Sequence, residues 1–310
     1  MVELVRELSL ALRERVLPHL GSHAGRAHTD SAGAGGDVTF AIDEEAEAMI
    51  EPFLAERAPN VAFYSEDRGL VEPSAGCDHV LVIDPIDGTR PAMAGLEACC
   101  VSVAAAPLRH DVTMGEVTTA CVVEIPTGAV FLAERGKGLL EAPPVRLSRN
   151  QDLDRLFWAY GFRGRPARPL VQVVAVLIDR SSVGGAGFDL GSAAFCMTRV
   201  LTGQLDAYVE PGPLLVDEVP GMRHEFERVG GGAVLNNSPY DLAGAALCVT
   251  EGGGIVTDAR GGSLDDRPLL GSGPDFQMSV ITSASAPLHA KLVDEVASGM
   301  TQLSASVRDG

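Results

Sequence analysis

The segment HVLVIDPIDGT, residues 79–89, constrains the fold of this chain more than any other stretch. A short apolar run ends at Asp84, and a second acid, Asp87, follows three residues later. An apolar run of this length, bounded by Pro and Gly, predicts a buried strand. Because two ionised carboxylates repel unless a proton or a cation lies between them, the end of this strand calls for a counter-charge.

The residues around the two acids favour a cation. Pro85 fixes its own φ and Gly88 permits a close backbone approach, so a sharp turn is expected to bring Asp84 and Asp87 together. Mg²⁺ takes such oxygens and often bridges to a substrate phosphate, and the N–H groups of Gly88 and Thr89 suit a phosphate. The stretch predicts a metal site beside an anion site. The alternative is a tight turn whose acids cap a helix or face water.

The composition of the chain limits its size class and the kinds of molecule that it can bind. The chain has 310 residues, of which 46% are hydrophobic, enough for one large domain or two medium ones. Its net charge is −18, from 42 acids and 24 bases, which argues against a nucleic acid polymer as partner. An anionic substrate would need a local reversal of this field, which a divalent cation provides.

The N-terminal residues 1–20 carry charges among apolar residues at helical spacing, which predicts an amphipathic helix rather than a signal peptide. No run of 18 apolar residues occurs, so we expect no membrane contact. The six cysteines form no CxxC pair and lie mostly in apolar segments, as is typical of reduced thiols in a cytoplasmic protein.

Strand and helix patterns alternate irregularly along the chain, which indicates layered α/β or α+β architecture. We expect an N-terminal half at 1–145 that carries the DPIDGT segment and a C-terminal half at 146–310. A hairpin turn is predicted at 126–128, and a helix is predicted to begin at Gly191-Ser192 and to end at Gly203.

DPIDGT resembles the signature of the inositol monophosphatase superfamily, whose members hydrolyse small phosphate monoesters with Mg²⁺. Further segments resemble the family's motifs and follow in its order: GDVTFAIDEEAE at 36–47, FYSED at 63–67, LGSAAFCMTRVLTGQLDAYVE at 190–210 and YDLAGAALCVTEGGGIVTD at 240–258. The resemblance spans about residues 5–285. It implies an α-β-α-β-α sandwich of the inositol monophosphatase and fructose-1,6-bisphosphatase type, and a homodimer.

The resemblance also implies site residues. Two or three Mg²⁺ ions would be held by five groups, Glu66, Asp84, the Ile86 carbonyl, Asp87 and Asp241. Thr89 and Glu66 would orient the attacking water, with Asp43 nearby. The substrate would contact Gly88, Thr89, Ser192, Ala193 and, through a hydroxyl, Glu210. Asp43, Asp241 and Ser192 could instead only cap helices, and Glu66 could be an exposed strand end.

The chain departs from the family pattern between Glu210 and Asp241, where thirty residues stand in place of a handful. We expect this insertion, at about 211–239, to form a lid or an oligomer contact that selects a substrate other than plain inositol phosphate. The alternative is an exposed or disordered loop. Excising 213–237 is expected to change substrate preference more than stability. Arg90 and Pro91 also replace the residues usual after Gly-Thr.

The sequence therefore predicts a Mg²⁺-dependent phosphatase acting on an inositol, sugar or related polyol phosphate through metal-activated water. Alternatives within the superfamily are a bisphosphatase, a histidinol-phosphate phosphatase and a phosphoadenosine-phosphate phosphatase. A different class is a catalytically silent, metal-binding relative with a regulatory or structural role. A nucleotide-dependent kinase is disfavoured, because the chain has no G-x-x-x-x-G-K-[ST] loop.

Overall fold

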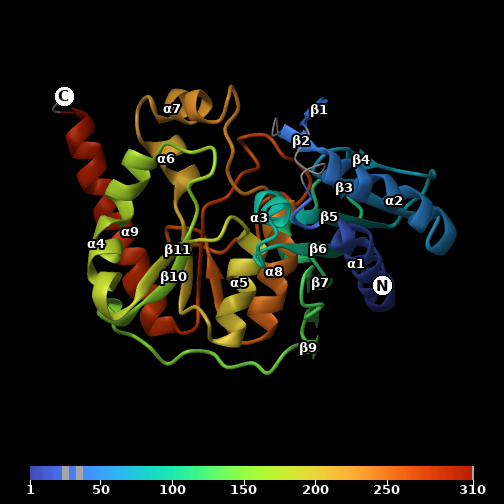
Figure 1. Cartoon of the computed structure of the whole chain (residues 1–310), viewed down its shortest axis with the longest axis horizontal. Coiled ribbons are helices and arrows are strands. Elements are labelled where there is room, and N and C mark those ends of the chain that lie inside the picture. The colour runs from blue at the N-terminus through green and yellow to red at the C-terminus, as the bar shows by residue number, and fades with distance from the viewer. Residues whose placement is uncertain (23–27, 33–37, 309–310) are drawn as a thin grey trace.

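The computed structural model describes residues 1–22, 28–32 and 38–308. Two sheets alternate with layers of helices (Figure 1). Across the seven-stranded sheet the order is β4 (Gly69–Val71), β3 (Val61–Ser65), β5 (His79–Asp87), β6 (Cys100–Pro107), β7 (Thr119–Glu124), β8 (Val130–Glu134) and β9 (Gly138–Glu141). Across the five-stranded sheet it is β11 (Ala186–Asp189), β10 (Phe157–Tyr160), β12 (Ala207–Glu210), β14 (Val280–Ser283) and β13 (Ile255–Thr257).

Helices cover both faces of both sheets. The outer layer on the seven-stranded sheet holds α1 (Val2–Val16) and α2 (Ala41–Arg57), and the middle layer between the sheets holds α5 (Ala193–Thr202) and α8 (Pro239–Glu251). The outer layer on the five-stranded sheet holds α4 (Ala167–Gly184) and α9 (Ala286–Arg308). Shorter elements are β1 (His28–Ala32), β2 (Val38–Phe40), α3 (Thr89–Ala94), α6 (Gly212–Glu218) and α7 (Met222–Val229). The predicted α-β-α-β-α sandwich is confirmed.

The strand β5 shows why its sequence is apolar throughout. Val80 and Val82 pack in the core shared with α5 and α8, whereas Leu81 and Ile83 pack in the core shared with α1 and α2. Side chains alternate between the faces of a sheet, and here helices cover both faces, so every position of the strand from 80 to 87 is buried. The predicted amphipathic helix is α1, which buries Val5, Leu8 and Leu12 among other residues.

Other local predictions are also confirmed. The turn between β7 and β8 is a hairpin in which Gly128 has φ +74°. Ser192 caps α5, where its side chain accepts a hydrogen bond from Phe195 N, and Gly203 ends the helix with φ +73°. The expected boundary near residue 145 falls between β9 and β10. The division into two halves stays a prediction, because α5 and α8 pack in one core that includes residues of both sheets. Among the described helices we find no candidate for a membrane span.

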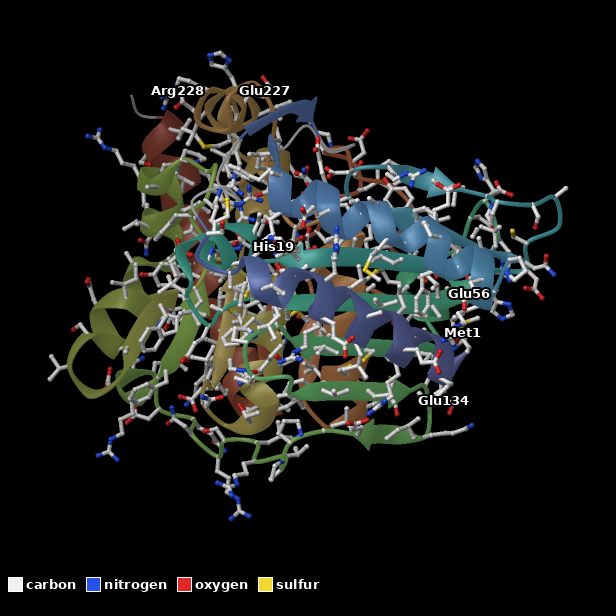
Figure 2. All side chains as sticks on the ribbon, turned by 45° about the vertical axis from the view of Figure 1, so that its right-hand side comes forward. Met1, His19, Glu56, Glu134, Glu227 and Arg228 are labelled. Atoms are coloured by element: carbon white, nitrogen blue, oxygen red, sulfur yellow. The ribbon has the colours of Figure 1, made fainter. Side chains whose placement is uncertain are left out.

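The insertion at 211–239 is folded, which makes two expectations about it wrong. Leu215 of α6 and Phe226 of α7 are fully buried in the core that α4 and α9 share with the five-stranded sheet. Arg228, on the other side of α7, is exposed (Figure 2). Because the insertion supplies core side chains, its excision would expose the apolar surface beneath it. It is neither a disordered loop nor a segment whose removal would spare stability.

Candidate active site

A β-bulge at the end of β5 turns its two acids toward the same side. Asp84 pairs with Ser102 of β6 and Asp87 pairs with Cys100, so β5 takes three steps where β6 takes two. On a regular strand, residues three apart point to opposite faces. The extra residue of the bulge cancels this alternation, and the two carboxylates can then meet. The predicted sharp turn is thus a bulge within the strand.

Gly88 follows the bulge in a conformation that other residues rarely adopt. Its φ is +94°, and a Cβ there would lie 2.5 Å from the Ala98 carbonyl oxygen and 2.9 Å from Ser192 Cβ. Both the backbone angle and the close approach therefore require glycine. The chain then enters α3, and the Thr89 hydroxyl donates to the Ile86 carbonyl oxygen at 3.2 Å.

Two further acids come to the bulge from distant segments. Ser65 at the end of β3 pairs with Ile83, so Glu66 follows directly beside Asp84. Asp241 lies in the first turn of α8, where its carboxylate accepts a hydrogen bond from Ser238 N at 2.6 Å. One oxygen from each of Asp84, Asp87 and Asp241 lies within 4.8 Å of the others.

One cavity, here called the acidic cavity, unites most of the predicted site. The predicted residues that line it are Glu66, Asp84, Ile86, Asp87, Gly88, Thr89 and Asp241. Arg90 and Arg163 line it as well. The acidic cavity thus brings together the predicted metal ligands and the residues predicted to orient water.

Asp87 takes the hydrogen bonds that we expected a phosphate to receive. The Ser192 hydroxyl donates to Asp87 Oδ2 at 2.8 Å and Ala193 N donates to Asp87 Oδ1 at 3.2 Å. Ala194 N also donates to Asp87 Oδ2. The start of α5 therefore holds the carboxylate of Asp87, a predicted metal ligand, in place. Contact of Ser192 and Ala193 with the substrate stays a prediction.

The electrostatics of the carboxylates favours a divalent cation. Burial, and next the charge of Asp87, raise the pKa of Asp84 well above its usual range. Burial also raises the pKa of Asp87, against the hydrogen bonds from Ser192 and α5, and raises the pKa of Asp241 to about 7. Buried like charges are unfavourable without a counter-ion. A hard cation with oxygen ligands, such as Mg²⁺, fits this donor set.

Two predicted residues lie away from the acidic cavity as the structure describes it. Asp43 is in the first turn of α2, where its carboxylate accepts from Phe40 N at 3.0 Å. Glu210 is fully buried, forms an ion pair with Arg165 and accepts from Gly212 N at 3.0 Å. Glu210 is not among the described residues that line the acidic cavity. The expected contact of Glu210 with a substrate hydroxyl stays a prediction.

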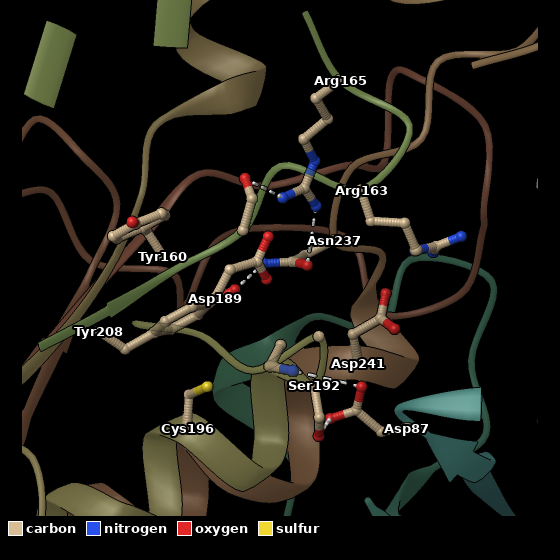
Figure 3. Close-up of a pocket in the computed structure, with 13 residues that line it drawn as sticks. Asp87, Tyr160, Arg163, Arg165, Asp189, Ser192, Cys196, Tyr208, Asn237 and Asp241 are labelled. Carbon is tan, nitrogen blue, oxygen red and sulfur yellow. Dashed lines mark hydrogen bonds between the residues drawn. The ribbon is translucent and has the colours of Figure 1, made fainter. Parts of the chain in front are cut away.

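A second cavity, here called the distal cavity, adjoins the acidic one (Figure 3). Its walls include Tyr160, Arg163, Arg165, Asp189 and Asn237, none of which we predicted from the sequence. β10 lies between β11 and β12 and runs parallel to both. Ligands of α/β sheets bind at the carboxyl ends of such strands, so the loop GFRGRP after Tyr160 was the missed signal.

Glu47 supports the turn that carries Glu66. It is almost fully buried, accepts from the Ser65 hydroxyl at 2.8 Å and accepts from Asp67 N at 3.4 Å. Glu66 lies between these two donors in the sequence. Burial raises the pKa of Glu47 to about 7. Glu47 therefore holds the turn on both sides of Glu66. We had assigned it no role, although it belongs to the segment GDVTFAIDEEAE at 36–47.

Several known proteins resemble this chain. The Inositol-1-monophosphatase of Mesorhizobium japonicum is 26% identical over 263 residues, which cover 83% of this chain and 86% of the relative. The Nus factor SuhB of Escherichia coli is 29% identical over 231 residues, which cover 73% of each chain. The Thermotoga maritima IMPase structure superposes with a TM-score of 0.68 at 22% identity and covers 97% of each chain, which shows the shared fold.

The sequence model described as "Inositol monophosphatase family" matches residues 2–298, nearly the whole chain. Four of the five segments that carried the resemblance contribute residues to the wall of the acidic cavity, among them Glu66, Gly191 and Asp241. The chain belongs to the inositol monophosphatase family.

Proposed function

We propose that this protein is a Mg²⁺-dependent phosphatase that hydrolyses a small phosphate monoester. The observation that carries the proposal is the meeting of Asp84, Asp87 and Asp241 within 4.8 Å of one another, with Glu66 on the wall of the same cavity. Relatives whose names are those of phosphatases also support it, among them a Fructose-1,6-bisphosphatase/inositol-1-monophosphatase.

The four acids, with the Ile86 carbonyl, would hold two or three ions. Bound Mg²⁺ supplies positive charge to the phosphoryl oxygens and lowers the pKa of a bound water. Glu66 and Thr89 lie on the acidic cavity wall and would orient the attacking water there. The Ser192 hydroxyl and the start of α5 would keep Asp87 in its position through their hydrogen bonds.

Positioning and charge stabilisation carry most of the catalysis in phosphoryl transfer. The acids of this chain would provide the positioning and, with their bound ions, the charge stabilisation. The protein would then need to form no covalent bond with the substrate. Asp43 near the attacking water, the homodimer and the cytoplasmic location stay predictions.

Phosphate release tests the proposal. Purified protein is assayed on inositol 1-phosphate, fructose 1,6-bisphosphate, histidinol phosphate and 3′-phosphoadenosine 5′-phosphate, with Mg²⁺ and with a chelator. We expect Mg²⁺-dependent release from at least one substrate, abolished by the chelator. Absence of release across this panel and a wider set of sugar phosphates would contradict the proposal.

The second candidate is a regulatory protein without catalysis, which the names of the Nus factor relatives motivate. The same assay distinguishes the two. A protein that binds Mg²⁺ in calorimetry but releases no phosphate from any substrate fits the second candidate. The retention of all four acids favours the phosphatase.

A further inference from the structure

The strand β11 forms an open edge of the five-stranded sheet, because among the described strands it has a neighbour on one side only. Ala186 N donates to the Leu156 carbonyl oxygen at 2.9 Å, so the backbone groups of Ala186 face β10. Since these groups alternate in direction along a strand, the N–H and C=O of Gly187 and Asp189 point away from the sheet. Gly187 has no side chain and is exposed, so solvent reaches the backbone itself.

Apolar side chains are exposed beside this edge. Phe157 of β10 pairs with Ala186, so Phe157 lies on the same face of the sheet as Ala186 and Phe188. Phe157 is 45% exposed and Phe188 is 37% exposed. Val183, which precedes β11 at the end of α4, is 96% exposed. An open strand edge with apolar neighbours is a template for pairing with another strand.

The other described edges of the two larger sheets are protected. β4 has three residues and lies between Arg68 and Glu72. β9 shifts its register against β8, and its Gly138 N donates to the Glu251 carboxylate at 2.8 Å. β13 has three residues, all half-buried. Flanking charges, irregular register and short length are the usual protection of a sheet edge. In contrast, β11 pairs in regular register with β10 at all four of its residues.

The charge around β11 favours a second copy of this chain as the partner. Residues 181–188 contain no charged side chain, although the chain has a net charge of −18. The charges next to this stretch are paired with each other. Arg180 pairs with Asp154 at 2.7 Å, and Arg155 pairs with Asp152 at 3.9 Å. A charged peptide would find no complementary charge along these residues, whereas a second copy would meet an uncharged surface like its own.

Antiparallel pairing of two copies would satisfy the outward-facing groups. A two-fold axis at Phe188 places Gly187 of each copy opposite Asp189 of the other. Both residues face outward, so each such pair exchanges two hydrogen bonds. Phe188 then lies opposite the same residue of the second copy in a non-hydrogen-bonded pair, where cross-strand side chains are closest.

We propose that β11 is the contact surface between two copies of this chain, and that their five-stranded sheets join there into one continuous sheet around a two-fold axis at Phe188. The proposal does not depend on the proposed phosphatase function. Asp189 and Gly191 line the distal cavity, so the contact would lie beside the candidate active site. Pairing would then hold in place the end of β11 that forms part of the distal wall.

Sedimentation and amide exchange of the wild-type protein test the proposal. We expect a dimer with Kd in the micromolar range, because a strand of four residues with few apolar neighbours buries less than the ~1,600 Å² of a standard interface. The amides of Gly187 and Asp189 should be protected from exchange well above Kd and lose this protection well below it. The amide of Phe188 faces β10 and should be protected equally at both concentrations.

Opposite charges at position 188 test the two-fold axis. Phe188→Glu and Phe188→Lys should each weaken dimerisation by about tenfold or more, because like charges would face each other across the axis. An equimolar mixture of the two variants should dimerise again, because opposite charges then face each other. Leu140→Glu is the matched control, since Leu140 is an exposed apolar residue on the edge strand β9. It should leave Kd within about twofold.

Three results would overturn the proposal. The first is a wild-type protein that stays monomeric at hundreds of micromolar. The second is exchange of the Gly187 and Asp189 amides that does not depend on concentration. The third is a mixture of the two folded Phe188 variants that dimerises no better than either alone. Circular dichroism establishes that each variant is folded. Where a variant does not fold, the exchange experiment decides, because it needs no substitution.

Discussion

At the scale of single residues, the site depends on where one carboxylate is held. Asp87 ends the β5 bulge and accepts hydrogen bonds from the Ser192 hydroxyl and from two amides of α5. These donors counteract the burial that raises its pKa. They engage both oxygens, so an amide in place of the carboxylate would also set an N–H group against one of these donors.

Asp87→Asn is expected to lower phosphate release by about a thousandfold or more. The substitution keeps the shape but removes a charged ligand, and each factor of ten corresponds to about 1.4 kcal/mol of barrier. Phosphate release at saturating Mg²⁺ and Mg²⁺ titration calorimetry measure the effect. Asp179→Asn, an exposed change on α4, should retain full activity. Unchanged activity in Asp87→Asn would contradict the metal assignment.

Glu47 provides a test of pH dependence in chelator. Its pKa is raised from 4.5 to about 7 in the folded protein, so the folded state binds more protons than the unfolded state between these values. The stability that Glu47 contributes in its protonated form is therefore full below pH 4.5 and falls as pH rises toward 7.

Glu47→Gln should remove this slope. The difference in unfolding free energy between pH 5 and pH 8 should shrink by about 2–3 kcal/mol relative to wild type, since one pKa unit is about 1.4 kcal/mol. Urea denaturation at both pH values measures it. Glu51→Gln, on the exposed side of the same helix, should leave the slope unchanged. An equal slope in Glu47→Gln and wild type would show that Glu47 does not titrate as described.

At the scale of elements, the insertion is both a part of the core and a wall of the site. α6 and α7 bury apolar side chains against the layer of α4 and α9. The segment after α7 then supplies Leu235 and Asn237 to the Arg165 guanidinium. The packing of α7 and the geometry of the distal cavity are therefore linked through one short segment.

Phe226→Ala should destabilise the protein by about 3–5 kcal/mol, because it removes a fully buried aromatic ring and leaves a cavity. His224→Ala, an exposed change on the same helix, should stay within about 0.5 kcal/mol. Urea denaturation measures both unfolding free energies. Similar values for the two variants would mean that α7 does not pack on the core.

At the scale of the whole molecule, the site joins two layers. Glu66, Asp84 and Asp87 come from the seven-stranded sheet and its following turns, whereas Asp241 comes from α8 in the middle layer. Repulsion among these acids opposes the contact between the layers. A bound cation would reverse this effect. The net charge of −18 makes such local neutralisation more important.

Addition of Mg²⁺ to chelator-treated protein should therefore raise the unfolding free energy, by about 2.7 kcal/mol at a concentration a hundredfold above Kd. Asp84→Asn should be more stable than wild type in chelator, because repulsion is relieved, and should respond less to Mg²⁺. Denaturant titrations with and without Mg²⁺ at constant ionic strength measure both effects. A wild-type protein that shows no response to Mg²⁺ would contradict the site.

The sequence alone determined the local features of this protein. The apolar strand ending in acids, the glycine at Gly88 and the serine cap of α5 depend on neighbouring residues, and the order of motifs identified the layered fold. Only the tertiary structure decided three other features: the bulge that aligns Asp84 with Asp87, the ion pair between Glu210 and Arg165, and the packing of the insertion. Each depends on strand register or on contact between distant segments, and burial and Coulomb energies follow distances in space rather than separation along the chain.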